Sequence, residues 1–386
     1  MGRLLRIDAL RGLAVFGILL INVWGFVYGY TVLRYGALPE AASVGDQLAI
    51  FVCAAFAEQK FYPVFSFLFG AGFALQWKSL LATHTAQDAA AIYRRRIQWL
   101  LACGLLHGCL LWLGDILTAY SLIGFWLLAV GPQRLGELWR TARTLVWINA
   151  GLFALIGGIA FLFASAPLAE RIETVIDLER SHAIYTLGGM RPIAWQRVTD
   201  FGAQVIGFPF FLPRLALLFL CGVFAVRLGW LTRPERHRRF WWRVLAWSMA
   251  LALPLNLWWG TAALTIAADP FHQPLWTAWA SAVQEMAGAG LAAGYVAAFM
   301  LAAPRALAWL APVGRMALTN YLMQSLLCAL LLQGQGLGWG AHLPRAALPL
   351  FCAGVMLFQL AFSHYWLARH AQGPMEALWR RYTLGA

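Results

Sequence analysis

The sequence predicts an all-α integral membrane protein, and three observations lead to this fold class. Hydrophobic residues make up 61% of the chain and charged residues only 12%, whereas soluble domains carry about 25% charged residues. Apolar stretches of about 20 residues, the length that a helix needs to cross a bilayer, recur from one end of the chain to the other. Because backbone groups in lipid must pair within their own segment, we expect these stretches to be helices; the alternation typical of a membrane β-barrel is absent.

These stretches define a helical bundle of about ten transmembrane helices in one domain, residues 1–386. The expected spans are 12–30, 48–77, 97–114, 116–132, 144–166, 201–226, 240–267, 278–303, 316–334 and 346–368. The second span is long and contains Glu58 and Lys60, so we expect a tilt, a kink or a re-entrant section there. The third and fourth spans join tightly at Gly114 and Asp115. The longest stretch between spans, near 167–200, is predicted to be an extracytoplasmic loop.

The basic residues set the orientation of the chain, since short cytoplasmic loops are enriched in Lys and Arg. If the amino terminus lies in the cytoplasm, roughly three quarters of the Lys and Arg residues fall on the cytoplasmic side, as this rule requires. The run from Arg227 to Arg243 lies there, whereas the acidic segment from Glu170 to Glu179 lies outside. An even number of spans and two cytoplasmic termini follow.

Composition and motifs exclude several function classes. The formal net charge of +13 does not indicate nucleic-acid binding, because the basic residues are spread over many loops, where topology and anionic lipids account for them. All six cysteines fall within spans without a metal-ligand spacing, so we expect no metal site. A nucleophile elbow, a Walker loop, an HEXXH motif and a dinucleotide fingerprint are absent.

His107 and Asp115 are the candidate catalytic residues, because ionisable groups inside spans are costly. His107 lies about 16 Å along its helix from Arg96, roughly at mid-bilayer. Desolvation keeps an imidazole neutral there, so that it can act as a general base; a neutral histidine bonded to a carbonyl is the alternative. Asp115 is either a partner that orients an imidazole or the N-cap of the following helix.

Other polar residues inside the spans are candidates for binding substrate or for joining helices. Asp8 and Arg11 are spaced as an intrahelical pair, and Glu285 and Arg214 are buried charges that can pair with each other. Asn320 and Gln324 form a polar stripe that either holds helices together or faces a ligand. The candidate substrate-binding residues are Asn22, Glu58, Lys60, Asn320, Gln324 and Glu285.

Five blocks of the sequence resemble the YeiB-like family of bacterial inner-membrane proteins. They are RIDALRGLAVFGILLINV (6–23), KFYPVFSFLFGAGFALQ (60–76), RRRIQWLLACGLLHGCLLWLGDILTAYSLIG (94–124), GRMALTNYLMQSLL (314–327) and GPMEALWRRYTLG (373–385). The blocks occur in order over nearly the whole chain. The resemblance implies a multi-pass protein of the bacterial cytoplasmic (inner) membrane.

The opening Asp-x-x-Arg-Gly of this family, here Asp8 to Gly12, is similar to that of the heparan-α-glucosaminide N-acetyltransferase group of transmembrane acyltransferases. That similarity implies transfer of an acyl group from cytoplasmic acyl-CoA, acetyl-CoA being the simplest, to a hydroxyl or amine on the far side. A membrane-buried histidine is the centre of such chemistry, and His107 is the matching residue, with Asp115 near the outer face.

The same resemblance assigns roles to residues at both sides of the membrane. Arginine binds phosphate bidentately, so Arg11, Arg94, Arg95 and Arg96 would bind the CoA phosphates, unless they only set topology. An oxyanion donor is also required, for which Asn22, Asn320 and Gln324 are the amides to consider. The acceptor is a cell-envelope glycan, a lipid or a small hydroxylated metabolite. Analogy and small-residue helix faces predict a homo-oligomer, such as a homodimer, in contact with membrane lipids.

Two other functions fit the same residues. In a transporter or channel, Glu58, Lys60, His107 and Glu285 would form a path for protons or a small solute. In a non-catalytic lipid-binding protein, the buried polar residues would serve packing alone. Turnover of acyl-CoA would distinguish an acyltransferase from both of these functions.

Overall fold

The computed structural model describes residues 2–29, 33–164 and 167–384, and these form an all-α bundle, as predicted. No strand occurs in this part of the chain. The helices are α1 (Gly2–Tyr28), α2 (Val44–Phe56), α3 (Phe61–Leu80), α4 (Ala86–Leu110), α5 (Leu117–Val130), α6 (Leu135–Ala164), α7 (Leu168–Leu187), α8 (Met190–Ile206), α9 (Phe208–Arg227), α10 (Arg238–Trp247), α11 (Leu253–Ala268), α12 (Leu275–Leu301), α13 (Ala311–Arg315), α14 (Ala317–Leu332), α15 (Ala347–Leu367) and α16 (Pro374–Leu384).

Length and hydropathy identify a multi-pass membrane protein, but the count of ten spans is not confirmed. Within the described residues, six helical segments are long and apolar enough to cross a membrane. A seventh is obtained if α12 and the following segment to Arg315, bent by 117°, form one broken span. The other three predicted spans correspond to α4, which carries three arginines, and to the shorter apolar helices α5 and α14.

One predicted element is interrupted where expected, and another takes a different form in the structure. The long second span is broken between Phe56 and Phe61 into α2 and α3, at the position of Glu58 and Lys60, where we expected a kink. The stretch 167–200, predicted as a loop, instead contains α7 and most of α8. The pair packs back onto the bundle, because Arg197 of α8 donates to the carbonyl of Leu110 at the end of α4.

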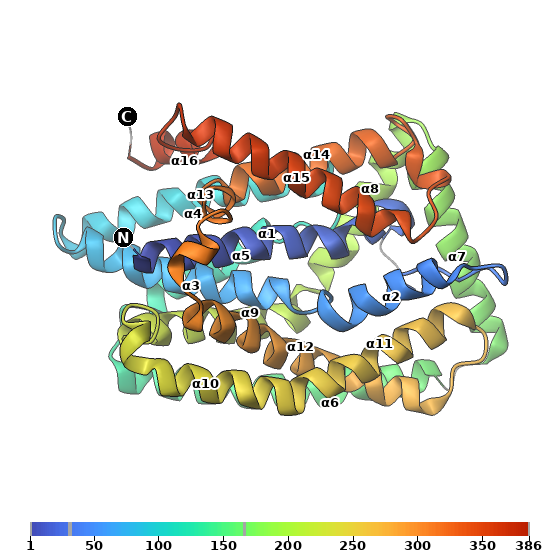
Figure 1. Cartoon of the computed structure of the whole chain (residues 1–386), viewed down its shortest axis with the longest axis horizontal. Coiled ribbons are helices and arrows are strands. Elements are labelled where there is room, and N and C mark those ends of the chain that lie inside the picture. Colours follow the sequence, from blue (N-terminus) through green and yellow to red (C-terminus); the bar gives the residue numbers. More distant parts are fainter. Residues whose placement is uncertain (1, 30–32, 165–166, 385–386) are drawn as a thin grey trace.

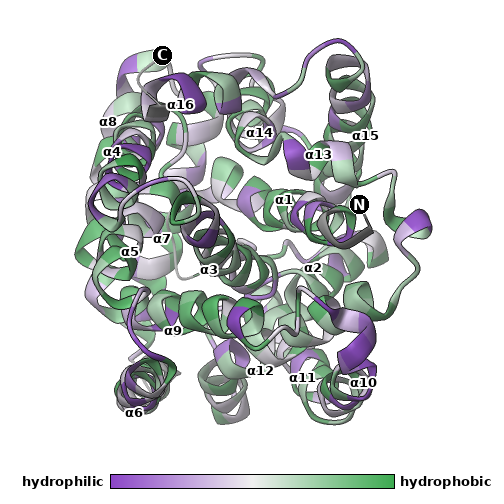
Figure 2. Cartoon of the chain, turned by 90° about the vertical axis from the view of Figure 1, so that its left-hand side faces the viewer, coloured by the Kyte–Doolittle hydropathy of each residue, from purple (hydrophilic) through white to green (hydrophobic). Residues whose placement is uncertain are grey.

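The basic residues gather at one end of the bundle. The start of α1, the turn between α3 and α4, the start of α10 and α16 all lie at the left-hand end in Figure 1, and Figure 2 looks onto this end. We call it the basic end. Here Arg6 donates to the carbonyl of Ala302, and Arg227 to that of Gln133.

The opposite end, called the far end, holds the loop before α2, α7 and the loop between α11 and α12 (Figure 1). Leu38 and Ala267 are hydrogen-bonded there, and Ala346 donates its amide to Asp46. The described beginning of α1 and the described part of α16 therefore share one end, as an even number of crossings requires.

Close helix crossings at glycines fix the helices that carry the site. At the α3–α9 crossing, a Cβ on Gly70 would lie 1.9 Å from the carbonyl oxygen of Phe219, and one on Gly222 would lie 2.0 Å from that of Phe67. At the α1–α13 crossing, a Cβ on Gly314 would lie 1.7 Å from the carbonyl oxygen of Asp8. Small residues let helices approach this closely in membranes, where lipid is as apolar as the side chains.

Candidate active site

The side chains of His107 and Asp115 are buried and lie within ion-pair distance of each other at the end of α4. The carboxylate oxygen Oδ1 of Asp115 lies 2.8 Å from Nδ1 of His107, and both side chains are almost completely buried. The chain makes this contact by ending α4 three residues after His107 and turning back. The amides of Leu111 and Trp112 both donate to the carbonyl of His107, which starts that turn.

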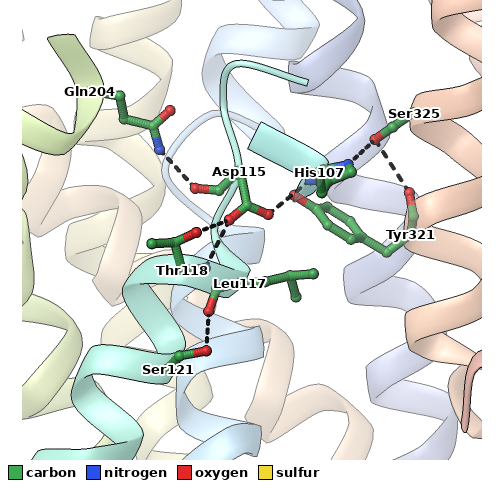
Figure 3. Close-up of polar contacts among 8 residues, drawn as sticks. All are labelled: His107, Asp115, Leu117, Thr118, Ser121, Gln204, Tyr321 and Ser325. Carbon is green, nitrogen blue, oxygen red and sulfur yellow. Dashed lines mark hydrogen bonds and ion pairs between the residues drawn. The ribbon is translucent and has the colours of Figure 1, made fainter. Parts of the chain in front are cut away.

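The second carboxylate oxygen of Asp115 holds the beginning of α5. It accepts hydrogen bonds from the amide of Thr118 at 2.8 Å and from its hydroxyl at 2.7 Å. Gln204 of α8 donates to the backbone carbonyl of Asp115 at 2.8 Å (Figure 3). The N-cap position of α5 is Ile116 rather than Asp115, but the Asp115 side chain still binds the first turn of α5 while it contacts the imidazole, so the two contacts weighed as alternatives from the sequence occur together.

Ser325 of α14 completes a chain of three polar groups. Its Oγ lies 2.8 Å from Nε2 of His107 and 3.4 Å from the carbonyl oxygen of Tyr321, one turn earlier on α14 (Figure 3). With Asp115 ionised, Nδ1 carries the proton of a neutral imidazole and Nε2 accepts a hydrogen bond from the serine. Such an arrangement prepares Nε2 to take a proton from a hydroxyl.

Sequence reasoning missed Ser325, although it lies within the family block 314–327. The available signal was a small polar residue in an apolar span, four residues after Tyr321 and hence on the same helix face. That signal is weak because serine is common in membrane helices, where it bonds to the backbone of its own turn.

Two cavities approach His107 from opposite ends of the bundle. The basic-end cavity has a volume of about 220 Å³ and is lined by Arg11, Arg96, Glu376 and Trp379, among others. The far-end cavity has a volume of about 380 Å³ and is lined by Asn22, Arg34, Glu58, Gln59 and Gln204, among others.

Tyr321 lines both cavities, together with Ile18 and Ile116. Its ring lies against the imidazole of His107, with the ring centres 4.9 Å apart. Neither His107 nor Asp115 is itself among the residues that line either cavity. The tyrosine ring therefore separates the buried polar chain from the point where the two cavities come closest.

Glu58 belongs to the wall of the far-end cavity, and its carboxylate is fully engaged. It accepts hydrogen bonds of 2.9 Å from each of three donors, Arg34, Tyr35 and Trp259. Its neighbour Gln59 also lines this cavity and is the non-glycine residue with positive φ (61°) among the described residues. A backbone held in this sparsely populated region is common at binding sites.

Lys60 does not reach the cavity. Its side chain is completely buried, and Nζ donates to the carbonyl of Ala54 at 2.7 Å. Asn22, by contrast, lies in the wall of the far-end cavity, as a candidate substrate-binding residue should.

Asn320 and Gln324 face away from His107. Asn320 donates to Ser363 of α15 at 3.0 Å and to the carbonyl of Val313, and Gln324 donates to Gln359 of α15 at 2.8 Å. Neither amide lines a cavity. The polar stripe thus joins α14 to α15, and the structure does not bring these two amides to the position predicted for an oxyanion donor.

Glu285 of α12 pairs with Arg214 of α9, the mutual pairing that the sequence left open. Arg214 also donates to the hydroxyl of Tyr62, which lines the far-end cavity. The pair therefore borders this cavity, although Glu285 itself does not line it.

The four arginines predicted to bind phosphate separate into two groups. Arg11 and Arg96 line the basic-end cavity, where the guanidinium of Arg96 lies 3.6 Å from the centre of the Trp379 ring. Arg11 is also paired with Asp8 at 3.0 Å, as its spacing predicted. Arg94 and Arg95 are exposed and lie outside the cavity, whereas Arg315 lines it. In the described part of the chain, no three His, Cys, Asp or Glu side chains are grouped to hold a metal ion.

The fold and the site together define a multi-pass helical membrane protein with an Asp–His–Ser chain buried beside the tyrosine that lines two cavities. The chain is similar to the YeiB-like family, the resemblance that its sequence blocks indicated. Residues 225–386 match the family model described as "Protein of unknown function (DUF418)".

Curated relatives show the same resemblance. The chain is 30% identical to "Uncharacterized protein YxaH" of Bacillus subtilis (strain 168) over 60% of each chain. It is 29% identical to "Uncharacterized protein YeiB" of Escherichia coli (strain K12), over 66% of this chain and 64% of that protein. The chain thus spans less than two thirds of the length of these relatives. No solved structure matches the chain.

Proposed function

We propose that this protein is an acyltransferase of the bacterial cytoplasmic membrane that works across the bilayer. It would take an acyl group from a cytoplasmic acyl-CoA at the basic end and pass it to a hydroxyl or amine acceptor at the far end. The observation that carries the proposal is the Asp115–His107–Ser325 chain, which lies behind the one tyrosine that lines both cavities.

The basic-end cavity suits an acyl-CoA thioester. Arg11, Arg96 and Arg315 supply positive charge among its lining residues, and arginine binds phosphate groups through two parallel hydrogen bonds. Deeper in the cavity the lining becomes apolar, with Phe69, Leu100 and others, which suits an acyl chain. The carboxylate of Glu376 also lines this cavity and is held at the start of α14 by hydrogen bonds from Leu318 and Thr319.

The proposed reaction is a direct transfer with His107 as general base. Nε2 takes the proton of the acceptor while the acceptor oxygen or nitrogen bonds to the thioester carbonyl carbon. The bond from carbon to sulfur then breaks, and the CoA thiolate leaves with the proton from the imidazolium. Asp115 holds Nδ1–H and stabilises the imidazolium that forms in between. In the substrate-free protein the Ser325 hydroxyl occupies the position next to Nε2 that the acceptor would take.

Access to His107 requires the ring of Tyr321 to turn aside, because it covers the imidazole on the cavity side. A closed position of this ring keeps the base His107 away from water in the cavities, which limits base-catalysed hydrolysis of the thioester when no acceptor is bound.

Transport is the second candidate, and the two cavities that meet at Tyr321 favour it, since alternating access uses such an arrangement. The contacts of the buried charged residues argue against transport. Glu58 is held by Arg34, Glu285 pairs with Arg214, and Lys60 binds a backbone carbonyl, so they do not form a continuous path with His107.

The first test is acyl-CoA turnover by the purified protein in lipid nanodiscs, read as release of free CoA thiol in the presence of candidate acceptors. We expect turnover by the wild type and by His364→Ala, whose histidine is exposed and bonded to the carbonyl of Trp309. We expect none from a folded His107→Ala variant.

Absence of acyl-CoA binding by the folded wild type would overturn the proposal. Proton-coupled uptake of a solute into proteoliposomes, lost in His107→Ala, would instead establish the transporter.

A further inference from the structure

A long apolar groove runs along the outer side of the bundle, away from the two cavities. It has a volume of about 640 Å³ and lies between α6, α9, α10 and α12, with residues of α3 at its base. We call it the α6–α12 groove. Its lining is apolar except at Arg143 and Cys221.

The groove exists because small side chains line α12 where α6 and α10 stand on either side. Ala289, Ala292 and Ala293 of α12 line it, and Ala293 is exposed. A row of alanines leaves a channel where larger side chains would fill the space, and such a channel has the shape of a hydrocarbon chain.

Aromatic pairs line two sides of the groove. Trp139 of α6 stacks on Phe224 of α9, and Trp230 stacks on Phe240 at the start of α10, each pair with ring centres 4.4 Å apart. All four rings line the groove. Trp139 and Phe240 lie near the basic ends of α6 and α10, and Trp230 lies in the turn after α9. Tryptophan is enriched at the level of lipid head groups.

Arg143 is the charged residue that lines the groove. It follows the start of α6 by eight residues, about 12 Å along the helix. Its side chain is exposed and makes no ion pair within the described residues. Arg140 on α6 and Arg239 and Arg243 on α10 are exposed near the same end. Positive charge is thus concentrated beside an apolar channel.

We propose that the α6–α12 groove is a binding site for an anionic glycerophospholipid of the leaflet at the basic end. One acyl chain lies along the alanines of α12, between the aromatic pairs, and the phosphate head group meets Arg143. Basic residues between membrane helices on the cytoplasmic side bind anionic head groups in this way.

The charge argues for this occupant over the alternatives. A second copy of the chain would have to bury Arg143 and supply a counter-charge to it, since a charge buried without one is costly in lipid. A zwitterionic lipid would fill the apolar channel equally well but would gain little from Arg143 and its neighbours. The proposal does not depend on the acyltransferase function.

Native mass spectrometry of the detergent-purified protein tests this site directly. The probes are phosphatidylglycerol and phosphatidylcholine with the same palmitoyl and oleoyl chains. We expect the wild type to retain phosphatidylglycerol in preference to phosphatidylcholine, with the preference falling as salt is raised. We expect Arg143→Gln to reduce the preference roughly fivefold, the change that one basic residue at the membrane surface contributes.

Filling the groove tests whether an acyl chain of the lipid binds in it. Ala293→Phe places a ring in the groove rather than in the protein core, because Ala293 is exposed, and should lower the retention of both lipids. Two matched controls should behave like the wild type. Arg134→Gln changes a residue in the connection between α5 and α6, and Met286→Phe changes an exposed residue of α12 outside the groove.

Three results would overturn the proposal. They are equal retention of the two lipids by the wild type, unchanged lipid binding in both groove variants, and a dimer that Ala293→Phe dissociates. The last would make the groove an interface between copies. The lipid comparison on the wild type remains decisive even if a variant does not fold.

Discussion

Asp115 uses both carboxylate oxygens and its backbone carbonyl to connect three elements. Oδ1 meets His107 of α4, Oδ2 accepts from Thr118 of α5, and the carbonyl accepts from Gln204 of α8. A buried carboxylate with all these partners is held in one orientation, and the imidazole is held with it. The residue whose substitution is most informative about chemistry is therefore Asp115, because it orients the imidazole without contacting either cavity.

Asp115→Asn is expected to abolish most of the activity while preserving the fold. The asparagine amide can donate to Nδ1, which would favour the tautomer with the proton on Nε2 and so remove the base. In a serine protease triad the equivalent change lowers kcat by about 10⁴-fold. The measurement is CoA release in nanodiscs, with thermal stability in parallel. Asp177→Asn, at an exposed ion pair on α7, is the control. Turnover close to that of the wild type would show that Asp115 serves only as a cap.

The Ser325→Ala variant distinguishes a serine that only occupies the acceptor position from a serine that forms an acyl intermediate. If the hydroxyl only occupies the acceptor position, as we propose, turnover should stay within about tenfold of the wild type, since general-base catalysis by His107 remains. Mass spectrometry of the peptide that contains Ser325, after incubation with acyl-CoA alone, should show no acyl adduct. An acyl adduct on that serine, together with complete loss of turnover in Ser325→Ala, would replace direct transfer by a covalent intermediate.

At the scale of helices, glycine crossings decide how closely the site-bearing elements approach. The contact of α3 with α9 is reciprocal, because Gly70 faces the backbone of Phe219 and Gly222 faces that of Phe67. Since the obstructing atoms belong to the backbone, an added side chain can be accommodated only by moving a helix. Both cavities take lining residues from α3, so such a movement would reach them.

Gly70→Val is accordingly expected to lower the stability of the bundle. Overpacking of a tight contact costs about 1–3 kcal/mol, and the measurement is thermal unfolding in detergent followed by circular dichroism. Gly354→Val on α15 is the matched control, because a Cβ there meets nothing within 4 Å. Equal melting temperatures for the two variants would contradict the close approach of α3 and α9.

The break between α2 and α3 shows which element-level features sequence can predict. Glu58 and Lys60 in an apolar stretch indicated an interruption, because a straight helix would leave two charges in lipid. The stretch 167–200 was harder, since its mixture of charged and apolar residues is equally compatible with a loop and with helices at the membrane surface. Its helical form depends on packing, including the contact of Arg197 with the end of α4.

At the scale of the whole molecule, the bundle is electrically polarised. The loops and helix ends with Arg94–Arg96, Arg227–Arg243 and Arg380–Arg381 share the basic end, and the acidic helix α7 lies at the other (Figure 1). The positive-inside rule then predicts that the basic end faces the cytoplasm.

Cysteine accessibility in whole cells tests this topology. In a variant that lacks the six native cysteines, Cys in place of Ala41 should react with a membrane-impermeant maleimide added outside, because it is exposed at the far end. Cys in place of Ala82, exposed in the turn between α3 and α4, should react only after the membrane is opened. The reverse pattern would contradict the orientation.

The sequence by itself determined the fold class, the approximate positions of most helices, the sharing of one end by the basic loops, and the choice of His107 and Asp115 as candidate site residues. Each follows from local composition. The length of an apolar stretch predicts a span, and the charge of the loops predicts its direction. A polar group in lipid is costly, so it marks a structural or functional site. His107 and Asp115 are also only eight residues apart, so a single turn can join them.

Only the tertiary structure decided which polar groups meet across helices. Ser325 reaches His107 over 218 residues of sequence, Glu285 pairs with Arg214, and Asn320 and Gln324 turn to α15 rather than to His107. Membrane helices are apolar on the side that faces lipid and largely apolar on the side that faces protein, so no amphipathic pattern fixes their rotation. Rotation is set by the packing of neighbouring helices, and it is the rotation of α14 that brings Tyr321 and Ser325 to the site.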